Sequence, residues 1–227
     1  MSDLARRCRL GLDLGGRAAT ALLLAVGLLL ACSSAKRLAY EGFSRDRWQQ
    51  PERVIAALGI RPGDRVADLG SGSGYFTIHL ARAVGTDGRV YAVDVDEAMN
   101  EYLRQRIAEA EVANVDVILG RFEEPLLPDG RIDLVLVVDT YHHLEDRPAY
   151  FRNLQRDLAP GGRVAVIDYD ARTTWFMRLV GHTTSRDELG REMAEAGYEV
   201  LEEFDFIDRQ SFVIFRPMSF DAARRYR

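Results

Sequence analysis

The stretch VADLGSGSGYF, residues 66–76, joins an apolar run to three glycines at alternate positions. The run contains Asp68, glycines occupy positions 70, 72 and 74, and the aromatic pair Tyr75-Phe76 follows. Glycine adds no side-chain packing and costs conformational entropy, so this spacing indicates positive φ angles or the close approach of a ligand to the backbone. We therefore expect a buried strand, a glycine turn beside a ligand, and then a helix.

The chain around this stretch alternates between apolar strand-like runs and helical segments. The expected strands cover residues 65–70, 89–95, 115–120, 132–140 and 163–169, and the expected helices cover 51–60, 75–84, 97–110 and 147–158. Runs rich in valine and isoleucine are typical of strands with helices on both sheet faces. This alternation predicts a doubly wound, mostly parallel sheet.

The last third of the chain follows a different pattern. Ser185 and Glu188 form a capping box that opens a helix ending near Gly197. Two strands, 198–207 and 210–217, then follow with two residues between them, which predicts an antiparallel hairpin. The expected fold class is α/β: a Rossmann-like sheet of seven strands in a domain over 51–217, followed by a tail over 218–227.

Composition excludes several classes of function. The formal net charge of the 227 residues is −5, without the clustered arginine and lysine of a nucleic-acid-binding surface. Cys8 and Cys32 are the two cysteines, and both precede the domain. A domain without cysteine has no internal disulfide, no cysteine nucleophile and no thiolate metal site.

Residues 1–32 resemble a bacterial lipoprotein signal peptide. Four arginines precede the uncharged run 18–31, which is too short for a comfortable membrane span but typical of a secretory signal. The run ends in Leu29-Leu30-Ala31-Cys32. The resemblance implies a lipidated Cys32 and a membrane-attached domain on the periplasmic or outer-membrane side. An uncleaved inner-membrane anchor is the alternative. Basic residues lie on both sides of the run, so they do not decide which side of the membrane the domain would face.

The glycine spacing distinguishes between nucleotide-binding motifs. The sequence G-x-G-x-G differs from the dinucleotide fingerprint G-x-G-x-x-G, because Tyr75 stands where the third glycine belongs, and it lacks the phosphate-loop lysine. Asp94 ends the next expected strand. A carboxylate at that position can accept both hydroxyls of a ribose.

With Asp68, the stretch 68–74 resembles the D-x-G-x-G-x-G motif of class I S-adenosylmethionine-dependent methyltransferases. That family has a seven-stranded sheet ending in a hairpin, so the likeness extends over about residues 48–217. The resemblance implies S-adenosylmethionine as cofactor and a role for each matching position. Asp68, Gly70, Ser71, Gly72 and Gly74 would hold the methionine end, Asp94 the ribose, and Val95, Phe122 and Glu123 the adenine, with Arg121 where the family often has an acid.

The end of the fourth expected strand, VVDTYHHLED, supplies the candidates for contact with the methyl acceptor. By the same resemblance these are Asp139, Tyr141, His142 and His143, with Asp139 also near the cofactor. A histidine titrates in the range that suits a general base. The alternative is that one of the histidines packs or caps the following helix. No third ligand accompanies the pair, so we expect no metal site.

Two further segments are candidates for closing the site. Residues 33–50 are a connector whose end, RDRWQQ, is a lid in related methyltransferases, so that Trp48 would close the pocket or simply cover the sheet edge. Asp168 and Asp170 end the fifth expected strand, and the aromatic cluster 175–177 follows. That cluster is either part of an acceptor pocket or a packing surface.

These patterns together predict a membrane-attached S-adenosylmethionine-dependent methyltransferase with a small-molecule or lipid-like acceptor. The alternatives are a non-catalytic S-adenosylmethionine-binding sensor or scaffold and, less favoured because of Tyr75, an NAD-dependent oxidoreductase. Export through Cys32 would separate the domain from the compartment where the cofactor is made. That conflict keeps the anchor interpretation open.

Overall fold

The computed structural model describes residues 45–170 and 183–218, which belong to a compact unit beginning at Ser44. The predicted leader 1–32, the connector up to residue 44, the aromatic cluster 175–177 and nearly all of the tail lie outside the described residues. In the two described ranges no helix has the length and apolar character that a membrane crossing needs.

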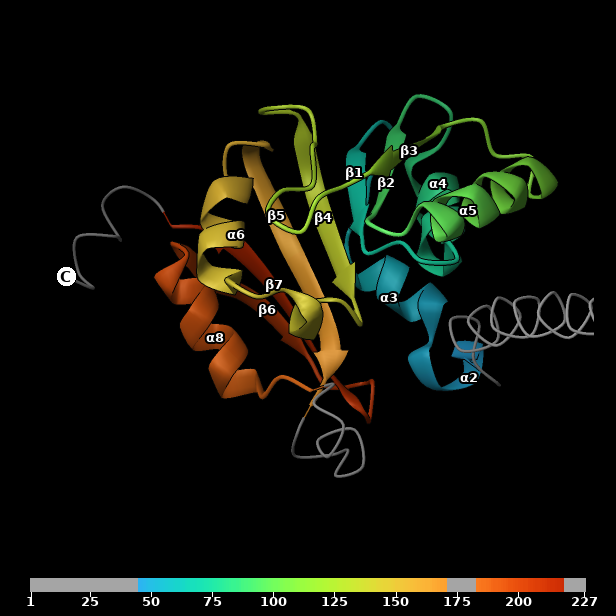
Figure 1. The fold of residues 1–227 in the computed structure, drawn as a ribbon. Helices are drawn as coiled ribbons and strands as arrows, with labels where there is room; N and C mark the ends of the chain where they lie inside the picture. The colour runs from blue at the N-terminus through green and yellow to red at the C-terminus, as the bar shows by residue number, and fades with distance from the viewer. Residues whose placement is uncertain (1–44, 171–182, 219–227) are drawn as a thin grey trace, which may run out of the picture. The chain divides into compact units, whose positions relative to one another are not determined.

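The domain is built on one seven-stranded sheet with the order β3-β2-β1-β4-β5-β7-β6 (Figure 1). Of the described strands β7 alone runs opposite to the others, so that it pairs antiparallel with both β5 and β6. The predicted fold class, including the antiparallel hairpin, is confirmed. The strands are β1 Arg65–Leu69, β2 Arg89–Asp94, β3 Val115–Leu119, β4 Ile132–Val138, β5 Leu158–Tyr169, β6 Tyr198–Phe204 and β7 Gln210–Pro217.

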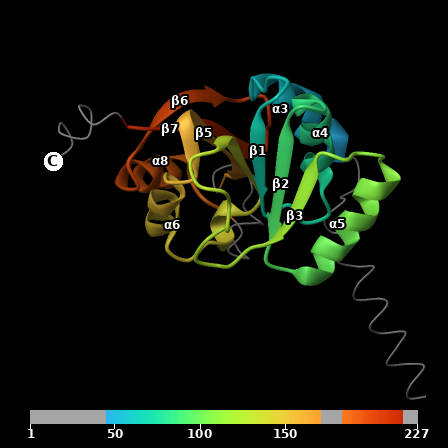
Figure 2. The same ribbon diagram turned by 90° about the horizontal axis from the view of Figure 1, so that it is seen from above.

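Helices cover both faces of this sheet. Figure 2 shows α3, α4 and α5 on one side and α6 and α8 on the other. The short helix α2 precedes α3, and the 3₁₀ turn η1 follows β4. The bounds are α2 Arg45–Gln49, α3 Pro51–Ala57, α4 Tyr75–Val84, α5 Glu97–Glu109, η1 Tyr141–His143, α6 Arg147–Leu154 and α8 Arg186–Glu195.

Alternate residues of each central strand enter different cores, because successive side chains point to opposite faces of a sheet. In β4, Leu134 and Leu136 pack with α3 and α4, whereas Val135 and Val137 pack with α6 and α8. All four side chains are fully buried. The near-continuous apolar runs in the sequence are explained by these two cores.

β5 begins five residues earlier than predicted, and α6 correspondingly ends at Leu154 rather than residue 158. Leu158 already pairs with Ile132, and the segment Pro160-Gly161-Gly162 forms an irregularity inside the strand rather than a break before it. A Cβ on Gly162 would lie 2.6 Å from the Ile132 carbonyl oxygen. The turn residues therefore mark a close approach between strands.

The hairpin connection is longer than predicted. β6 ends at Phe204, so residues 205–209 join the strands instead of two residues. Phe206 and Ile207 leave the sheet: the Phe206 ring lies 4.3 Å from the Arg53 guanidinium, and Ile207 is buried. Their apolar side chains resemble a continued strand in the sequence, but they pack against the domain instead.

Candidate active site

The candidate site lies where the order of the strands reverses, at the carboxyl ends of β1 and β4. Ligands of open α/β sheets bind at this position. All three glycines after β1 have positive φ, at 76° for Gly70, 50° for Gly72 and 78° for Gly74. The positive φ angles expected from the spacing are confirmed, and this turn has a conformation that other residues rarely adopt.

Asp94 ties the glycine turn to the neighbouring strand. Its Oδ2 accepts the Gly72 N–H at 2.8 Å, and its Oδ1 accepts the Asp96 N–H at 2.9 Å. Each carboxylate oxygen has a second lone pair, so both can still accept a bond from a ligand hydroxyl. The half-buried Asp94 is thus held at the turn by two backbone donors.

Three polar atoms near this turn are buried without a hydrogen-bond partner in the described part of the chain. They are the hydroxyl oxygens of Ser71 and Ser73 and the amide oxygen of Asn100. The Asn100 amide nitrogen donates to the Asp94 carbonyl at 3.1 Å, which places this residue beside the predicted ribose-binding carboxylate. Buried polar groups are normally bonded, so this cluster is typical of a site that binds a polar ligand or water.

Asp68 lies beneath the turn rather than at its surface. The Thr77 hydroxyl donates to its Oδ2 at 2.6 Å. Burial raises the pKa of Asp68 to about 6, against the opposing effects of the Thr77 hydrogen bond and the charge of Arg45. Asp68 therefore joins β1 to α4 beneath the glycine turn.

Asp139 adopts a conformation that is rare for a residue with a side chain, with φ of 53° directly after β4. Its carboxylate accepts a hydrogen bond from the Gln210 amide and lies 3.5 Å from the Arg45 guanidinium. Burial raises the pKa of Asp139 to about 6, although the charge of Arg45 opposes the rise. Backbone strain of this kind gathers at functional sites.

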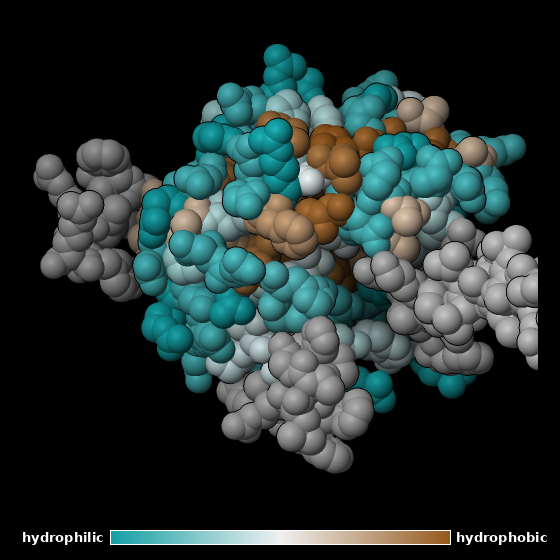
Figure 3. All heavy atoms as spheres, viewed as in Figure 1, coloured by the Kyte–Doolittle hydropathy of each residue, from teal (hydrophilic) through white to brown (hydrophobic). Residues whose placement is uncertain are grey.

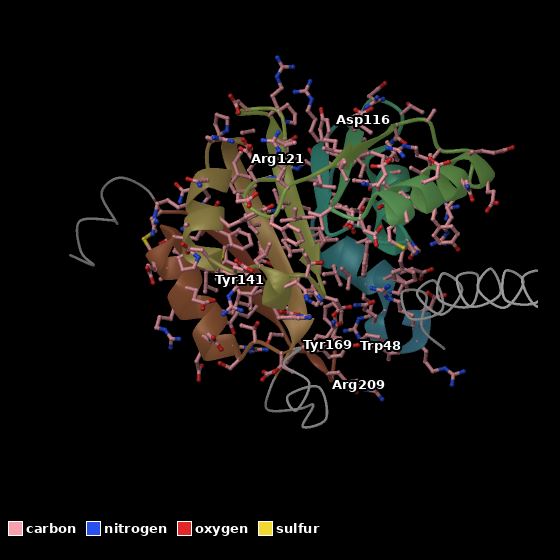
Figure 4. All side chains as sticks on the ribbon, viewed as in Figure 1. Trp48, Asp116, Arg121, Tyr141, Tyr169 and Arg209 are labelled. Atoms are coloured by element: carbon pink, nitrogen blue, oxygen red, sulfur yellow. The ribbon has the colours of Figure 1, made fainter. Side chains whose placement is uncertain are left out.

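The short helix α2 contacts this edge through several side chains. The Arg45 guanidinium lies 4.2 Å from the Tyr75 ring centre, and Gln49 donates to Gln210 at 3.0 Å. Trp48 stacks on Tyr169 with centroids 6.2 Å apart, and Figure 4 shows both at the carboxyl end of β5. The end of the predicted connector is thus packed on the domain, beside the candidate site.

His142 is paired with Asp168, the residue before the end of β5. Asp168 Oδ1 lies 2.7 Å from His142 Nδ1, and Oδ2 accepts the His142 backbone N–H at 3.1 Å. Both side chains are almost fully buried. One carboxylate therefore holds His142 at two points, the ring and the backbone N–H.

The structure separates the other two candidates of this segment. His143 is exposed, and its ring centre lies 4.1 Å from that of His142. Tyr141 is fully buried between α6 and α8, where its hydroxyl donates to Glu192 at 2.9 Å and its ring stacks on Phe151. Tyr141 therefore does not share the environment of His142 and Asp139.

The predicted adenine-side residues lie on the β2–α5 and β3–β4 connections. Phe122 and Glu123 line a cavity of about 250 Å³ together with Leu144, Asp146 and Tyr150. Phe122 is 67% exposed and Val95 42% exposed. Figure 3 shows apolar surface on this face of the molecule, between α6 and the strands β2 and β3.

Two residues of the site, Thr140 and Gln210, were not among the sequence candidates. A Cβ on Gly70 would lie within 2.8 Å of three side-chain atoms of Thr140. Gln210 reaches the site because the antiparallel β7 starts at the edge where β5 ends, with Tyr169 opposite Gln210. The predicted hairpin could have identified Gln210. A last strand that runs antiparallel to the parallel strands begins at the edge of the sheet where those strands end.

A metal centre is not found among the described residues: none of their histidine, cysteine, aspartate and glutamate side chains form a group of three that could hold an ion. The site contains four groups of polar or charged residues. They are the glycine turn with Asp94, the buried Asp68, the Asp139–Arg45 pair and the His142–Asp168 pair.

Comparison with known proteins gives consistent matches. Residues 60–199 match the family model of a methyltransferase domain. The ubiquinone/menaquinone biosynthesis C-methyltransferase UbiE of Pseudomonas putida is 30% identical over 157 residues, which cover 63% of this chain and 61% of that protein. UbiE of Vibrio vulnificus is 33% identical over 117 residues, covering 51% and 45%. The chain thus spans about three fifths or less of these curated relatives.

A solved structure extends the likeness to nearly the whole domain. The crystal structure of a SAM-dependent methyltransferase from Aquifex aeolicus matches with a TM-score of 0.74 and 27% identity. The match covers 81% of this chain and 96% of the Aquifex chain.

Proposed function

Because this chain belongs to the methyltransferase domain family, we propose that it binds S-adenosylmethionine and transfers the methyl group to a small-molecule acceptor. The observation that carries the proposal is the glycine turn, which has positive φ at all three glycines and donates the Gly72 N–H to Asp94. In this arrangement the backbone of the turn and a carboxylate face the same edge of the sheet.

The residues present fit the cofactor. Its ribose hydroxyls need acceptors, which Asp94 supplies, and its polar groups need donors and acceptors such as the unpartnered oxygens of Ser71, Ser73 and Asn100. Phe122 and Glu123 would hold the adenine. When bound, the cofactor supplies an electrophilic methyl group on a sulfonium sulfur.

Orientation of the acceptor is then the main task of the protein. Holding two reactants in line contributes much of the acceleration in such a transfer. Asp139, held by Gln210 and Arg45, and the clamped His142 are the rigid polar groups at the end of β4. His143, exposed beside them, is the second proposed contact for the acceptor.

The relatives suggest which acceptor to test first. Their names describe C-methyltransferases of ubiquinone and menaquinone biosynthesis, so we propose a hydroxylated aromatic ring as the acceptor class. A lipid-like acceptor belongs to the same proposal.

Calorimetric titration of the full chain with S-adenosylhomocysteine tests cofactor binding. Replacing Asp94 with alanine removes the proposed ribose acceptor and should weaken binding about 100-fold, since hydrogen bonds to charged groups contribute about 1.5–3 kcal/mol each. Asp116→Ala is the matched control, because Asp116 lies on β3 away from the carboxyl edge and pairs with Arg89 (Figure 4).

The same titration distinguishes the alternatives. If calorimetry detects binding of NAD(H) but not of S-adenosylhomocysteine, the proposal is overturned in favour of an oxidoreductase. Binding of S-adenosylhomocysteine would favour the non-catalytic sensor if, in a separate assay, the protein forms no S-adenosylhomocysteine from S-adenosylmethionine with 1,4-dihydroxynaphthalene or other hydroxyaromatic acceptors. If Asp94→Ala and Asp116→Ala bind S-adenosylhomocysteine with equal affinity, the proposed cofactor site is wrong.

Attachment to a membrane is a second part of the proposal and is supported by sequence alone. The basic residues, the uncharged run 18–31 and Cys32 support a lipoprotein signal, and an uncleaved anchor is the alternative. A Cys32→Ala variant should lose lipid labelling and membrane recovery if Cys32 is lipidated. Reporter enzymes fused after residue 227 would establish the side that the domain faces.

A further inference from the structure

Four side chains at the carboxyl edge of β4 form a closed ring of polar contacts. The Arg45 guanidinium donates to the Gln49 amide oxygen, and the Gln49 amide nitrogen donates to the Gln210 amide oxygen at 3.0 Å. The Gln210 amide nitrogen donates to Asp139, and Arg45 closes the ring at 3.5 Å from Asp139. Both amides thus have their oxygen on the arginine side and their nitrogen on the carboxylate side, so the ring fixes Asp139 as an acceptor.

The ring holds Asp139 in a backbone conformation that is unfavourable for a residue with a side chain. Asp139 has φ of 53°, in the left-handed region. Gln49 and Gln210, which are buried, come from α2 and β7, so two other elements of the domain support this conformation. The Asp139 side chain is nonetheless 27% exposed. Part of a rigidly held carboxylate is therefore accessible to a ligand.

The order of the strands indicates which part of the proposed cofactor lies near Asp139. The proposed adenine contacts follow β2 and β3, the proposed ribose contact Asp94 ends β2, and the glycine turn follows β1. β4 is next in the sheet order, and its Thr140 side chain lies against the position that a Cβ on Gly70 would occupy. A cofactor that extends from its adenine across the strands in this order has its sulfonium beside the tips of β1 and β4.

The charges near Asp139 leave its carboxylate incompletely compensated. The titratable and charged groups that interact with it come from α2, η1 and β5, and they are Arg45, His142, Asp168 and Tyr169. Arg45 also acts on the buried Asp68 of β1, so two carboxylates share one guanidinium. Burial raises the pKa of Asp139 to about 6 although Arg45 opposes the rise. A cationic ligand group beside Asp139 would supply the compensation that Arg45 does not, and would favour the ionised carboxylate.

We propose that Asp139 is the counter-charge of the cofactor's sulfonium, and that Gln49 and Gln210 are the positioning residues that hold it there. This inference rests on the proposed function, since it requires S-adenosylmethionine to bind at the glycine turn. S-adenosylmethionine has one net positive charge because of its sulfonium, whereas S-adenosylhomocysteine has a neutral thioether and no net charge. Asp139 therefore makes the site select the cofactor over the demethylated product, which limits inhibition by that product.

Calorimetric titration of the full chain with both adenosyl compounds at neutral pH tests this preference. The wild type should bind S-adenosylmethionine more tightly than S-adenosylhomocysteine. Asp139→Asn keeps the shape of the side chain and removes its charge. It should weaken S-adenosylmethionine binding about tenfold and S-adenosylhomocysteine binding by less than about threefold, because only the sulfonium adds a charge beside the carboxylate. The matched control Asp116→Asn, on β3 beside Arg89, should change neither affinity.

Proton release on binding is a second measurement, and it needs only the wild type. Titration near pH 6 in buffers of different ionisation enthalpy should show more protons released with S-adenosylmethionine than with S-adenosylhomocysteine, because the sulfonium lowers the pKa of Asp139 from about 6. Contributions from Asp68 and from the ammonium group of the ligand are common to both compounds and cancel. The difference should vanish in Asp139→Asn. In Gln210→Met it should move to higher pH, since loss of the donated hydrogen bond raises the pKa of Asp139.

Several results would overturn the inference and leave the proposed function standing. Equal affinities of the wild type for the two compounds would do so, as would equal proton release with both. The same holds if Asp139→Asn weakens both compounds to the same extent, because Asp139 would then support the site without sensing charge. Denaturant unfolding checks that each variant is folded, and if Asp139→Asn is not, the wild-type comparison decides. If neither adenosyl compound binds the wild type, the proposed function itself is wrong.

Discussion

Replacing Gly70 with alanine tests the glycine turn most directly. Gly70 has φ of +76°, and the left-handed region costs about 1–2 kcal/mol for a residue with a Cβ. The added methyl would also lie 2.5 Å from Thr140 Cγ2 and 2.8 Å from Thr140 Cβ, with Thr140 Oγ1 closer still. Such overpacking costs about 1–3 kcal/mol, so we expect a total loss of about 2–5 kcal/mol.

Gly130→Ala separates the two contributions. Gly130 has φ of +63°, but nothing lies within 4 Å of the position of its Cβ. This control should therefore lose only the 1–2 kcal/mol of backbone strain. Denaturant unfolding of the full chain measures both variants, and the Gly70 variant should be less stable than the control by about 1–3 kcal/mol.

A double-mutant cycle then identifies the clashing partner. Thr140→Gly removes all three overlapping atoms, so in that background Gly70→Ala should cost about 1–3 kcal/mol less than in the wild type. S-adenosylhomocysteine affinity should fall in Gly70→Ala and stay unchanged in Gly130→Ala. The reasoning is refuted if the two single variants are equally stable, or if removal of the Thr140 side chain gives no relief.

Two further predictions concern the buried polar groups. The pKa of Asp68 is about 6 in the folded protein against 3.8 as its ordinary value, so its favourable contribution to folding is present below pH 4 and is lost as pH rises through 6. Relative to Asp68→Asn, wild-type unfolding free energy should thus fall by about 3 kcal/mol across this interval, measured by urea unfolding at each pH; parallel profiles would contradict the burial argument. Tyr141→Phe removes the bond to the Glu192 carboxylate and should cost about 1.5–3 kcal/mol of stability, while calorimetry and kinetics should show unchanged cofactor affinity and kcat. A tenfold loss of affinity in Tyr141→Phe would instead place its hydroxyl in the site.

Local sequence patterns predicted the elements well where one strand alternates with one helix. The run 65–69 and the helix from Tyr75 to Val84 match the prediction within a residue, because apolar periodicity and glycine act over a few neighbouring positions. Predictions were wrong where tertiary pairing overrides such signals. Pro160-Gly161-Gly162 lies inside β5 because Leu158 pairs with Ile132, and Phe206 leaves the hairpin to pack against Arg53.

The residues of the candidate site also fall into those that the sequence could identify and those that it could not. Gly70, Gly72, Gly74 and Asp94 could be identified from spacing, since the strand tips of a parallel sheet bring them together. Spacing could not tell Tyr141 from His142, which are adjacent in the chain. Their side chains point to different sides of a 3₁₀ turn, one to Glu192 and the other to Asp168.

The sequence by itself therefore determined the α/β class, the parallel sheet with its final hairpin, and the glycine turn with a carboxylate on the next strand. These features follow from backbone conformations and periodicities that a short segment specifies alone. Only the tertiary structure decided which polar side chains share the site, because Arg45, Asp139, Asp168 and Gln210 come from four separate elements. Their meeting depends on strand order and register, which are properties of long-range packing.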